Sequence, residues 1–204
     1  MSLSSLVLLL AILVWGLVHS LLASLTTKAR LRQWFGPASD RWYRLVYNMV
    51  SILTFLPILG LVAMDPGSTL YAIPAPWSYL AFAGQLLAIV ALGIGLLQTG
   101  TWSFLGIEQL LVDSGQGDAQ MVTAGLYRWV RHPLYTAGLA FIWLTPVMTV
   151  NLLVLNLGLT IYLVTGAFYE ERKLVREFGE QYTHYQARVP MLIPLVKGWP
   201  RNRA

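Results

Sequence analysis

Long apolar blocks are the feature of this sequence that most restricts its fold. Each block is about 20 residues long, the length of an α-helix that crosses the hydrocarbon core of a bilayer. Charged residues make up only 11% of the 204-residue chain, and apolar residues make up 56%. A soluble domain carries about 25% charged residues, so most of this surface does not face water. The sequence therefore predicts an all-α integral membrane protein.

The apolar blocks predict about five transmembrane helices in a single domain, residues 1–204. The N-terminal part (1–99) holds the first three spans. The C-terminal part (100–204) holds a helical hairpin that turns around Asn151, followed by an amphipathic helix on the cytoplasmic surface. The expected spans are Leu3–Leu25, Tyr43–Met64, Trp77–Leu97, Leu134–Val150 and Leu152–Tyr169.

The Lys and Arg residues all fall on one side of this arrangement. They cluster from Lys28 to Arg44, at Arg128 and Arg131, and from Arg172 onwards. The positive-inside rule makes that side cytoplasmic, so the N-terminus is expected outside and the C-terminus inside. These loops also account for the net charge of +5, so we expect no nucleic-acid partner. A bacterial plasma (inner) membrane is the expected location, with membrane lipids as partners.

The chain has no cysteine. Disulfides, thiolate nucleophiles, zinc–thiolate sites and iron–sulfur clusters are therefore excluded. We expect no metal to take part in its function.

A polar segment, GLYRWVRHPLY at residues 125–135, stands directly before the fourth expected span. Pro133 suits the first turn of a helix, where its missing N–H is not needed. Arg131 and His132 then lie at a helix N-terminus, whose N–H groups and positive dipole attract an anion such as a carboxylate.

An acidic pair, Glu170 and Glu171, directly follows the last apolar block. Ionised carboxylates are costly to bury in a membrane. Two interpretations are open: the helix has emerged into water and Glu170 pairs with Lys173, or the pair binds a cation. Together with the polar segment, whose tyrosines can pack on an adenine or approach a cation, the pair fits S-adenosylmethionine.

The two segments resemble the isoprenylcysteine carboxyl methyltransferase and phospholipid methyltransferase superfamily. The resemblance rests on GLYRWVRHPLY and on EERKLVREFGEQYTHYQARVPMLIP (residues 170–194), and it covers about residues 100–195. Three further motifs, HSLLAS (19–24), RLVYN (44–48) and FLGIEQLL (104–111), look like the NnrU/nurim branch, which includes methanethiol S-methyltransferases.

The resemblance implies a membrane-embedded methyltransferase that uses S-adenosylmethionine. Its acceptor would be small or lipophilic, namely a thiol, an isoprenylcysteine carboxylate or a lipid amine that arrives from the bilayer. Arg131 and His132 are the candidates for a catalytic role, and His132 is either a cofactor ligand or a base. The implied cofactor-binding residues are Gly125, Leu126, Tyr127, Arg131, His132, Pro133, Tyr135, Glu170 and Glu171. The candidate substrate-binding residues are His19, Asn48, Trp102 and Gln109.

Two other functions are open alternatives. The C-terminal pattern also resembles membrane sterol reductases that use NADPH, although an acidic pair is unwelcome where a 2′-phosphate would bind. The second alternative is a non-enzymatic membrane scaffold or haem carrier that uses His19 and His132.

Overall fold

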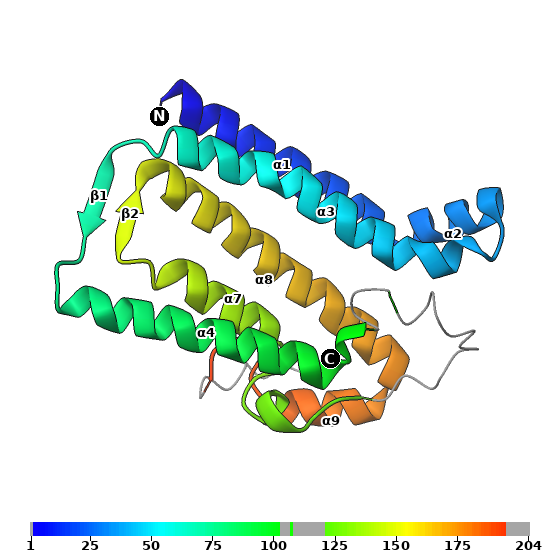
Figure 1. Ribbon diagram of the computed structural model, residues 1–204. Helices are drawn as coiled ribbons and strands as arrows, with labels where there is room; N and C mark the ends of the chain where they lie inside the picture. The colour runs from blue at the N-terminus through cyan, green and yellow to red at the C-terminus, as the bar shows by residue number, and fades with distance from the viewer. Residues whose placement is uncertain (1, 103–106, 108–120, 195–204) are drawn as a thin grey trace, which may run out of the picture. The chain divides into compact units, whose positions relative to one another are not determined.

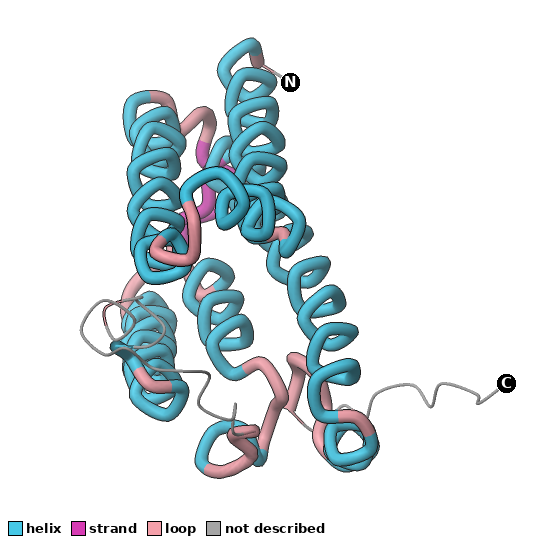
Figure 2. Tube along the Cα trace, turned by 90° about the vertical axis from the view of Figure 1, so that its right-hand side faces the viewer, coloured by secondary structure: helices cyan, strands magenta, loops and turns pink. Residues whose placement is uncertain are grey.

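The computed structural model describes residues 2–102, 107 and 121–194. These residues form helices and two short strands (Figures 1 and 2). The elements are α1 (Leu3–Ala23), α2 (Leu25–Phe35), α3 (Ser39–Met64), β1 (Thr69–Ala72), α4 (Trp77–Thr99), the 3-10 helix η1 (Gly125–Arg128), α7 (Pro133–Trp143), β2 (Val147–Thr149), α8 (Val150–Phe178) and α9 (Glu180–Arg188).

The chain divides into two compact units. The first consists of Met1–Ala72, Gly100–Asp118 and Val147–Leu159, and the second of Ile73–Thr99, Ala119–Pro146 and Thr160–Ala204. Helix α8 therefore begins in the first unit and continues into the second.

Four helices of the described residues, α1, α3, α4 and α8, are long and apolar enough to cross a membrane. They confirm the prediction that the chain is an all-α integral membrane protein. The remaining apolar helix, α7, has 11 residues. At about 1.5 Å per residue, it is too short to cross a hydrocarbon core about 30 Å thick. The described residues thus hold four helices of membrane-spanning length, and the expected number of five helical spans is not confirmed.

The expected fourth span, Leu134–Val150, and the hairpin turn around Asn151 are wrong. Helix α7 ends at Trp143, and the chain continues as strand β2. Pro146 explains the break, because it lacks an N–H and disfavours a helical conformation of the residue before it. Asn151 lies inside α8 and is only 2% exposed.

The connection between α3 and α4 contains strand β1. This strand pairs with β2 in antiparallel register, with Thr69 opposite Thr149 and Ala72 opposite Val147. Figure 2 shows the two short strands in magenta. Asn151 secures the same region, because its Nδ2 donates to the Asp65 carbonyl at 2.7 Å. The connection between α3 and α4 and the connection between α7 and α8 are therefore held together.

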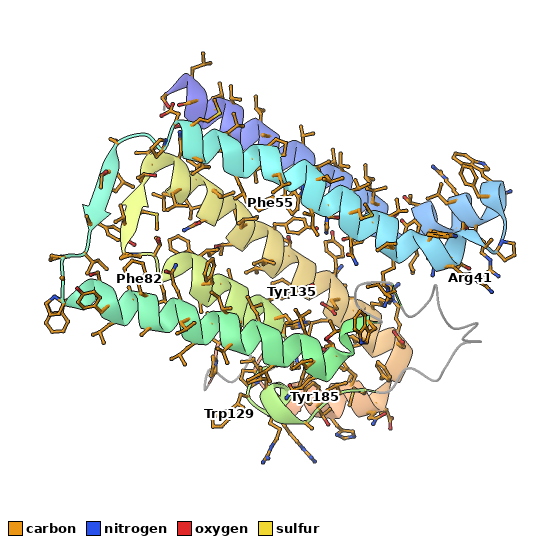
Figure 3. The ribbon with its side chains drawn as sticks, in the orientation of Figure 1. Arg41, Phe55, Phe82, Trp129, Tyr135 and Tyr185 are labelled. Carbon is orange, nitrogen blue, oxygen red and sulfur yellow. The ribbon has the colours of Figure 1, made fainter. Side chains whose placement is uncertain are left out.

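Helices of the first unit pack through apolar side chains. Leu8, Ile12, Ile58 and Leu155 form its buried core. Gly158 allows this packing, since a Cβ there would lie 2.8 Å from Ile12 Cγ2. At the edge of this core, the Phe55 ring (Figure 3) lies 5.0 Å from the ring of Trp15.

In the second unit, α4 packs against α7 through small residues. A Cβ on Gly84 would lie 2.8 Å from Leu144 Cδ1, and a Cβ on Gly95 would lie 2.8 Å from Leu134 Cδ2. Small residues let membrane helices approach closely in this way. The close approach places the start of α7 beside the end of α4. The start of α7 carries the RHP motif, which consists of Arg131, His132 and Pro133.

Helix α8 continues past the expected end at Tyr169 and includes the acidic pair. The chain then turns at Gly179, whose φ of +55° favours glycine, and forms α9. The predicted amphipathic helix corresponds to α9, which this turn separates from α8. Its aromatic residues also face the protein rather than the membrane alone, because Tyr182 is only 2% exposed.

Candidate active site

The Glu171 carboxylate is the centre of a buried polar network in the second unit. The Arg131 guanidinium binds it with two parallel hydrogen bonds, Nε to Oε1 and Nη2 to Oε2, both 2.8 Å long. The two side chains are each 9% exposed. A two-pronged, charge-assisted contact of this kind fixes both groups in direction as well as in distance.

Three further donors complete the network around Glu171. His132 Nε2 and the Tyr182 hydroxyl each lie 2.8 Å from Glu171 Oε1. The Gln186 side-chain amide donates to Oε2. Because Glu171 is buried and four side chains of the chain bind its carboxylate, the interpretation of this residue as solvated helix surface is wrong.

Arg131 also has partners on the segment after α8. Its Nη1 donates to the Gln186 carbonyl at 3.1 Å and to the Val189 carbonyl. Each of its three side-chain nitrogens therefore has an acceptor within the chain. Arg131 therefore helps to join the RHP segment to α8 and α9. Its contact with a cofactor carboxylate stays a prediction.

Glu170 differs from its neighbour in exposure. Its side chain is 43% exposed, and its Oε2 lies 3.5 Å from His132 Nδ1. His132 thus lies between the two carboxylates, with its side chain only 5% exposed. The Tyr135 ring stacks on the imidazole at 5.4 Å, with an angle of 6° between the planes.

The charges around His132 determine its protonation. Burial alone would lower the pKa of His132, but the hydrogen bonds and negative charges of Glu170 and Glu171 outweigh it. The pKa of His132 is therefore raised above its ordinary value of 6.5. The proton is therefore held more tightly by His132 than by an ordinary histidine.

The backbone also secures the RHP segment. Arg131 N donates to the Pro190 carbonyl at 2.9 Å, and His132 N donates to the Met191 carbonyl at 3.1 Å. The Thr136 hydroxyl reaches the Leu192 carbonyl at 2.6 Å. The start of α7 and residues 190–192 thus form one local structure.

Gly125 and Leu126 lie where η1 meets the end of α4. Leu126 N donates to Gln98 Oε1 at 3.1 Å. Gly125 has a φ of +61°, and a Cβ there would lie 1.9 Å from Gln98 Nε2. The positive φ favours a glycine, and a larger residue would also displace the Gln98 amide that accepts from Leu126 N.

Two tyrosines link η1 to α9. The Tyr185 hydroxyl (residue labelled in Figure 3) donates to the Tyr127 carbonyl at 2.5 Å. Burial is the main reason that the pKa of each of the two phenols, Tyr127 and Tyr185, is raised to about 12. Both are therefore neutral hydroxyls at physiological pH.

The structure thus brings together the predicted cofactor residues from Gly125 to Tyr135 with Glu170 and Glu171. The predicted substrate residues His19, Asn48 and Trp102 belong to the first unit, and Gln109 lies outside the described residues. His19 and Asn48 are partly buried, while Trp102 is 65% exposed. Their contact with a substrate stays a prediction.

Sequence reasoning missed Tyr182, Tyr185 and Gln186 as site residues. Tyr182 and Gln186 are four positions apart in α9, so their side chains project from one face of the helix. Both reach Glu171. The available signal is the tyrosine spacing in the FGEQYTHY motif, which is equally typical of an amphipathic helix on a membrane surface.

Residues 80–181, half of the chain, match the phospholipid methyltransferase family. The match contains the end of α4, the RHP segment and the acidic pair. The chain belongs to the phospholipid methyltransferase family. It is thus a membrane protein of a methyltransferase family, as the two C-terminal motifs predicted.

Two methanethiol S-methyltransferases match over longer ranges, and an isoprenylcysteine O-methyltransferase matches over a shorter one. The methanethiol S-methyltransferase of a Pseudomonas species is 31% identical over 198 residues, covering 91% of this chain and 74% of the relative. That of Crocosphaera subtropica is 29% identical over 194 residues, covering 90% and 72%. The human protein-S-isoprenylcysteine O-methyltransferase is 34% identical over 84 residues, covering 38% and 28%. These relatives support neither the reductase nor the scaffold alternative.

Proposed function

We propose that this protein transfers a methyl group from S-adenosylmethionine to a small or lipophilic acceptor, with a small thiol as the first choice. The observation that carries the proposal is the unequal state of the acidic pair. Glu171 is engaged by four side chains of the protein, while the side chain of Glu170 is 43% exposed beside His132.

The charges of the network suit a cation at Glu170. Arg131 balances one of the two carboxylates, so with neutral His132 the cluster carries one excess negative charge. Either a proton on His132 or a cationic group of a ligand can compensate it. The sulfonium and ammonium groups of S-adenosylmethionine are such cations, and an ion pair in a partly dry site gains more than one in water.

The other residues of the proposed site suit the remaining parts of the cofactor. The N-terminus of α7, after His132 and Pro133, favours a carboxylate through its dipole. The Tyr135 ring, stacked on His132, and the Tyr127 ring can pack against an adenine or a cation. Gly125 and Leu126 shape the loop that holds Tyr127.

In this proposal, Arg131 and Glu171 position the other groups. Their paired hydrogen bonds hold the imidazole of His132 in place. When bound, S-adenosylmethionine supplies an already activated methyl group. The protein is left to orient the cofactor and the acceptor and to exclude water from the reacting atoms.

The choice of a thiol follows from the relatives. Two methanethiol S-methyltransferases match 90% and 91% of this chain, while the isoprenylcysteine enzyme matches 38% of it.

We also propose that the site faces the cytoplasm of a bacterial cell. The pairing of β1 with β2 supports this orientation, because it requires both connections, 65–76 and 144–149, to lie on one side. Neither connection contains a Lys or Arg. The chain then passes between the two sides over α7 and residues 144–149 together, so the basic segments, including Arg128 and Arg131, belong to the opposite, cytoplasmic side.

A binding and transfer assay tests the proposal. The purified full chain in detergent is titrated with labelled S-adenosylmethionine and then given a small alkanethiol, a lipid amine or an isoprenylated cysteine. We expect label transfer to the alkanethiol. Glu170→Gln should weaken cofactor binding about ten- to a hundredfold, which corresponds to one charge-assisted hydrogen bond.

Glu177→Gln is the matched control, because Glu177 is an exposed residue of the same helix. It should bind the cofactor like the unchanged protein. Binding of NADPH or haem with no binding of S-adenosylmethionine would refute the proposal. Equal affinities of the Glu170→Gln and Glu177→Gln variants would refute the role of Glu170.

A further inference from the structure

Helix α2 of the first unit is a short helix without a core of its own. None of its 11 residues is buried. A helix of this length is marginal in water unless packing covers one of its faces. Two aromatic side chains at its end, Trp34 and Phe35, are 72% and 71% exposed. The described residues of the first unit therefore leave α2 with apolar surface for another partner to cover.

Polar contacts hold α2 at the end of the apolar helix α1. The Thr27 hydroxyl donates to the Leu21 carbonyl at 2.7 Å, and the Tyr43 hydroxyl of α3 donates to the Leu22 carbonyl. Helix α1 has 21 residues. At about 1.5 Å per residue, it matches a hydrocarbon core about 30 Å thick. Since α2 begins two residues after α1 ends, it lies at the depth of the lipid headgroups.

The start of α3 lies at the same depth. Helix α3 has 26 residues, which exceeds by about six the number needed to cross the hydrocarbon core. Its charged residues all fall within the first six positions, at Asp40, Arg41 and Arg44. Arg41 is labelled in Figure 3. This end of α3 therefore extends out of the core and into the headgroup layer.

The two segments carry a strong excess of positive charge. Residues 24–44 contain five basic residues and a single acidic one, Asp40. The Asp40 carboxylate is shared by two cations, with Oδ1 at 3.7 Å from Lys28 Nζ and Oδ2 at 3.4 Å from Arg32 Nη1. One carboxylate therefore leaves most of the positive charge uncompensated. We call the five exposed basic residues the basic surface: Lys28, Arg30, Arg32, Arg41 and Arg44.

The two faces of α2 carry different groups. Lys28 and Arg32 are one turn apart on the face that meets Asp40 of α3. Arg30 and Trp34 are also one turn apart, on the opposite face, and both are exposed. A cation beside an indole is typical of a helix that lies in the headgroup layer, where tryptophan is enriched.

We propose that the basic surface binds the headgroups of anionic phospholipids, with phosphatidylglycerol as the representative lipid. Its phosphodiester carries the charge that complements the surface, and the guanidinium fork of arginine matches phosphate oxygens. The anionic leaflet attracts basic segments next to a membrane span in this way. Trp34 and Phe35 then enter the boundary between headgroups and acyl chains, and this boundary covers α2. The basic surface contains none of the proposed cofactor residues, so it adds a lipid partner to the proposed methyl transfer.

Native mass spectrometry of the purified full chain in detergent tests this binding. The added lipid is either dioleoyl phosphatidylglycerol or dioleoyl phosphatidylcholine. We expect the unchanged protein to bind phosphatidylglycerol at least about tenfold more tightly, since each basic residue near an anionic lipid contributes about fivefold. Arg30→Gln should lower the affinity for phosphatidylglycerol about fivefold, and Arg30→Gln combined with Arg41→Gln about twenty-fivefold. The affinity for phosphatidylcholine should not change.

A variant with the opposite sign separates lipid binding from a loss of structure. Asp40→Asn removes the carboxylate that competes with phosphate for Lys28 and Arg32. It should raise the affinity for phosphatidylglycerol about fivefold, a gain that a damaged α2 does not produce. Thr26→Gln is the matched control, because Thr26 is an exposed, uncharged residue one turn before Arg30. It should bind both lipids like the unchanged protein, and unfolding midpoints in detergent check the fold of each variant.

Three outcomes would overturn the proposal. The first is equal binding of the two lipids by the unchanged protein. The second is a double Arg30→Gln, Arg41→Gln variant that binds phosphatidylglycerol as tightly as Thr26→Gln does, because the lipid then binds elsewhere. The third is displacement of phosphatidylglycerol by inorganic phosphate at the same concentration, which would make the surface a site for free anions. Each of these leaves the proposed methyl transfer intact, because that activity is measured in a separate assay.

Discussion

Glu171 and Arg131 form a two-pronged ion pair across 40 residues of sequence, with both hydrogen bonds at 2.8 Å. The pair joins the start of α7 to the C-terminal part of α8. It is buried at both ends, so removing one partner leaves an uncompensated charge inside the protein.

We therefore expect Glu171→Gln to destabilise the fold strongly. Breaking a buried ion pair by loss of one partner costs about 3–5 kcal/mol. The midpoint of thermal unfolding in detergent should fall by many degrees, and Glu177→Gln should leave it nearly unchanged. A Glu171→Gln variant as stable as the Glu177→Gln control would contradict the structural role of this pair.

The stability of the protein should depend on the protonation of His132. The pKa of His132 is raised in the folded state by Glu170 and Glu171, in spite of burial. A raised pKa means that the proton stabilises the fold. The contribution is fully present below the ordinary value of 6.5 and is lost as pH rises through the folded value.

Thermal unfolding measured from pH 6 to pH 9, a range chosen to bracket about 6.5, checks this prediction. The midpoint of the unchanged protein should fall with pH more steeply than that of His132→Gln. His184→Gln is the control, because His184 is exposed on α9. If His132→Gln and His184→Gln give parallel curves, His132 does not contribute in this way.

Gly125→Ala should destabilise the loop that carries Tyr127. An L-residue at a φ of +61° costs about 1–2 kcal/mol. The added methyl group would also meet the Gln98 side chain at 1.9 Å. The same substitution in a Gln98→Ala background removes the clash and leaves only the backbone cost.

The control for this substitution is Gly166→Ala in α8, where a Cβ meets nothing within 4 Å. It should be neutral or slightly stabilising, because alanine favours a helix interior. Unfolding midpoints of the three variants measure the effect. A Gly125→Ala protein as stable as Gly166→Ala would refute the conformational requirement.

The proposed orientation can be tested by labelling single cysteines, since the chain has none of its own. Ser68→Cys and Val147→Cys lie in the two connections joined by β1 and β2. Both should react with an impermeant maleimide on intact cells. Arg30→Cys should react only after permeabilisation, and labelling of all three from outside would contradict the orientation.

Much of the fold follows from local properties of the sequence. Helices α1, α3 and α4 appear where apolar blocks of membrane-spanning length occur, because hydropathy and length are properties of a continuous segment. The RHP segment was likewise predicted at the start of a helix, since Pro133 at the first helical position has a local cause. Hydropathy alone does not predict the end of α7, because the apolar run continues past it. Pro146, which cannot continue a helix, lies within that run.

The family was also decided by the sequence, because its motifs are continuous stretches of residues. Only the tertiary structure decided which residue of the acidic pair is bound by other side chains and which is exposed. Glu170 and Glu171 are adjacent and chemically identical, but a helix rotates successive side chains by about 100°. One carboxylate therefore points to Arg131, His132, Tyr182 and Gln186, while the other stays 43% exposed. Which of the two is turned inward depends on how the RHP segment and α9 pack around α8, and no local pattern records that packing.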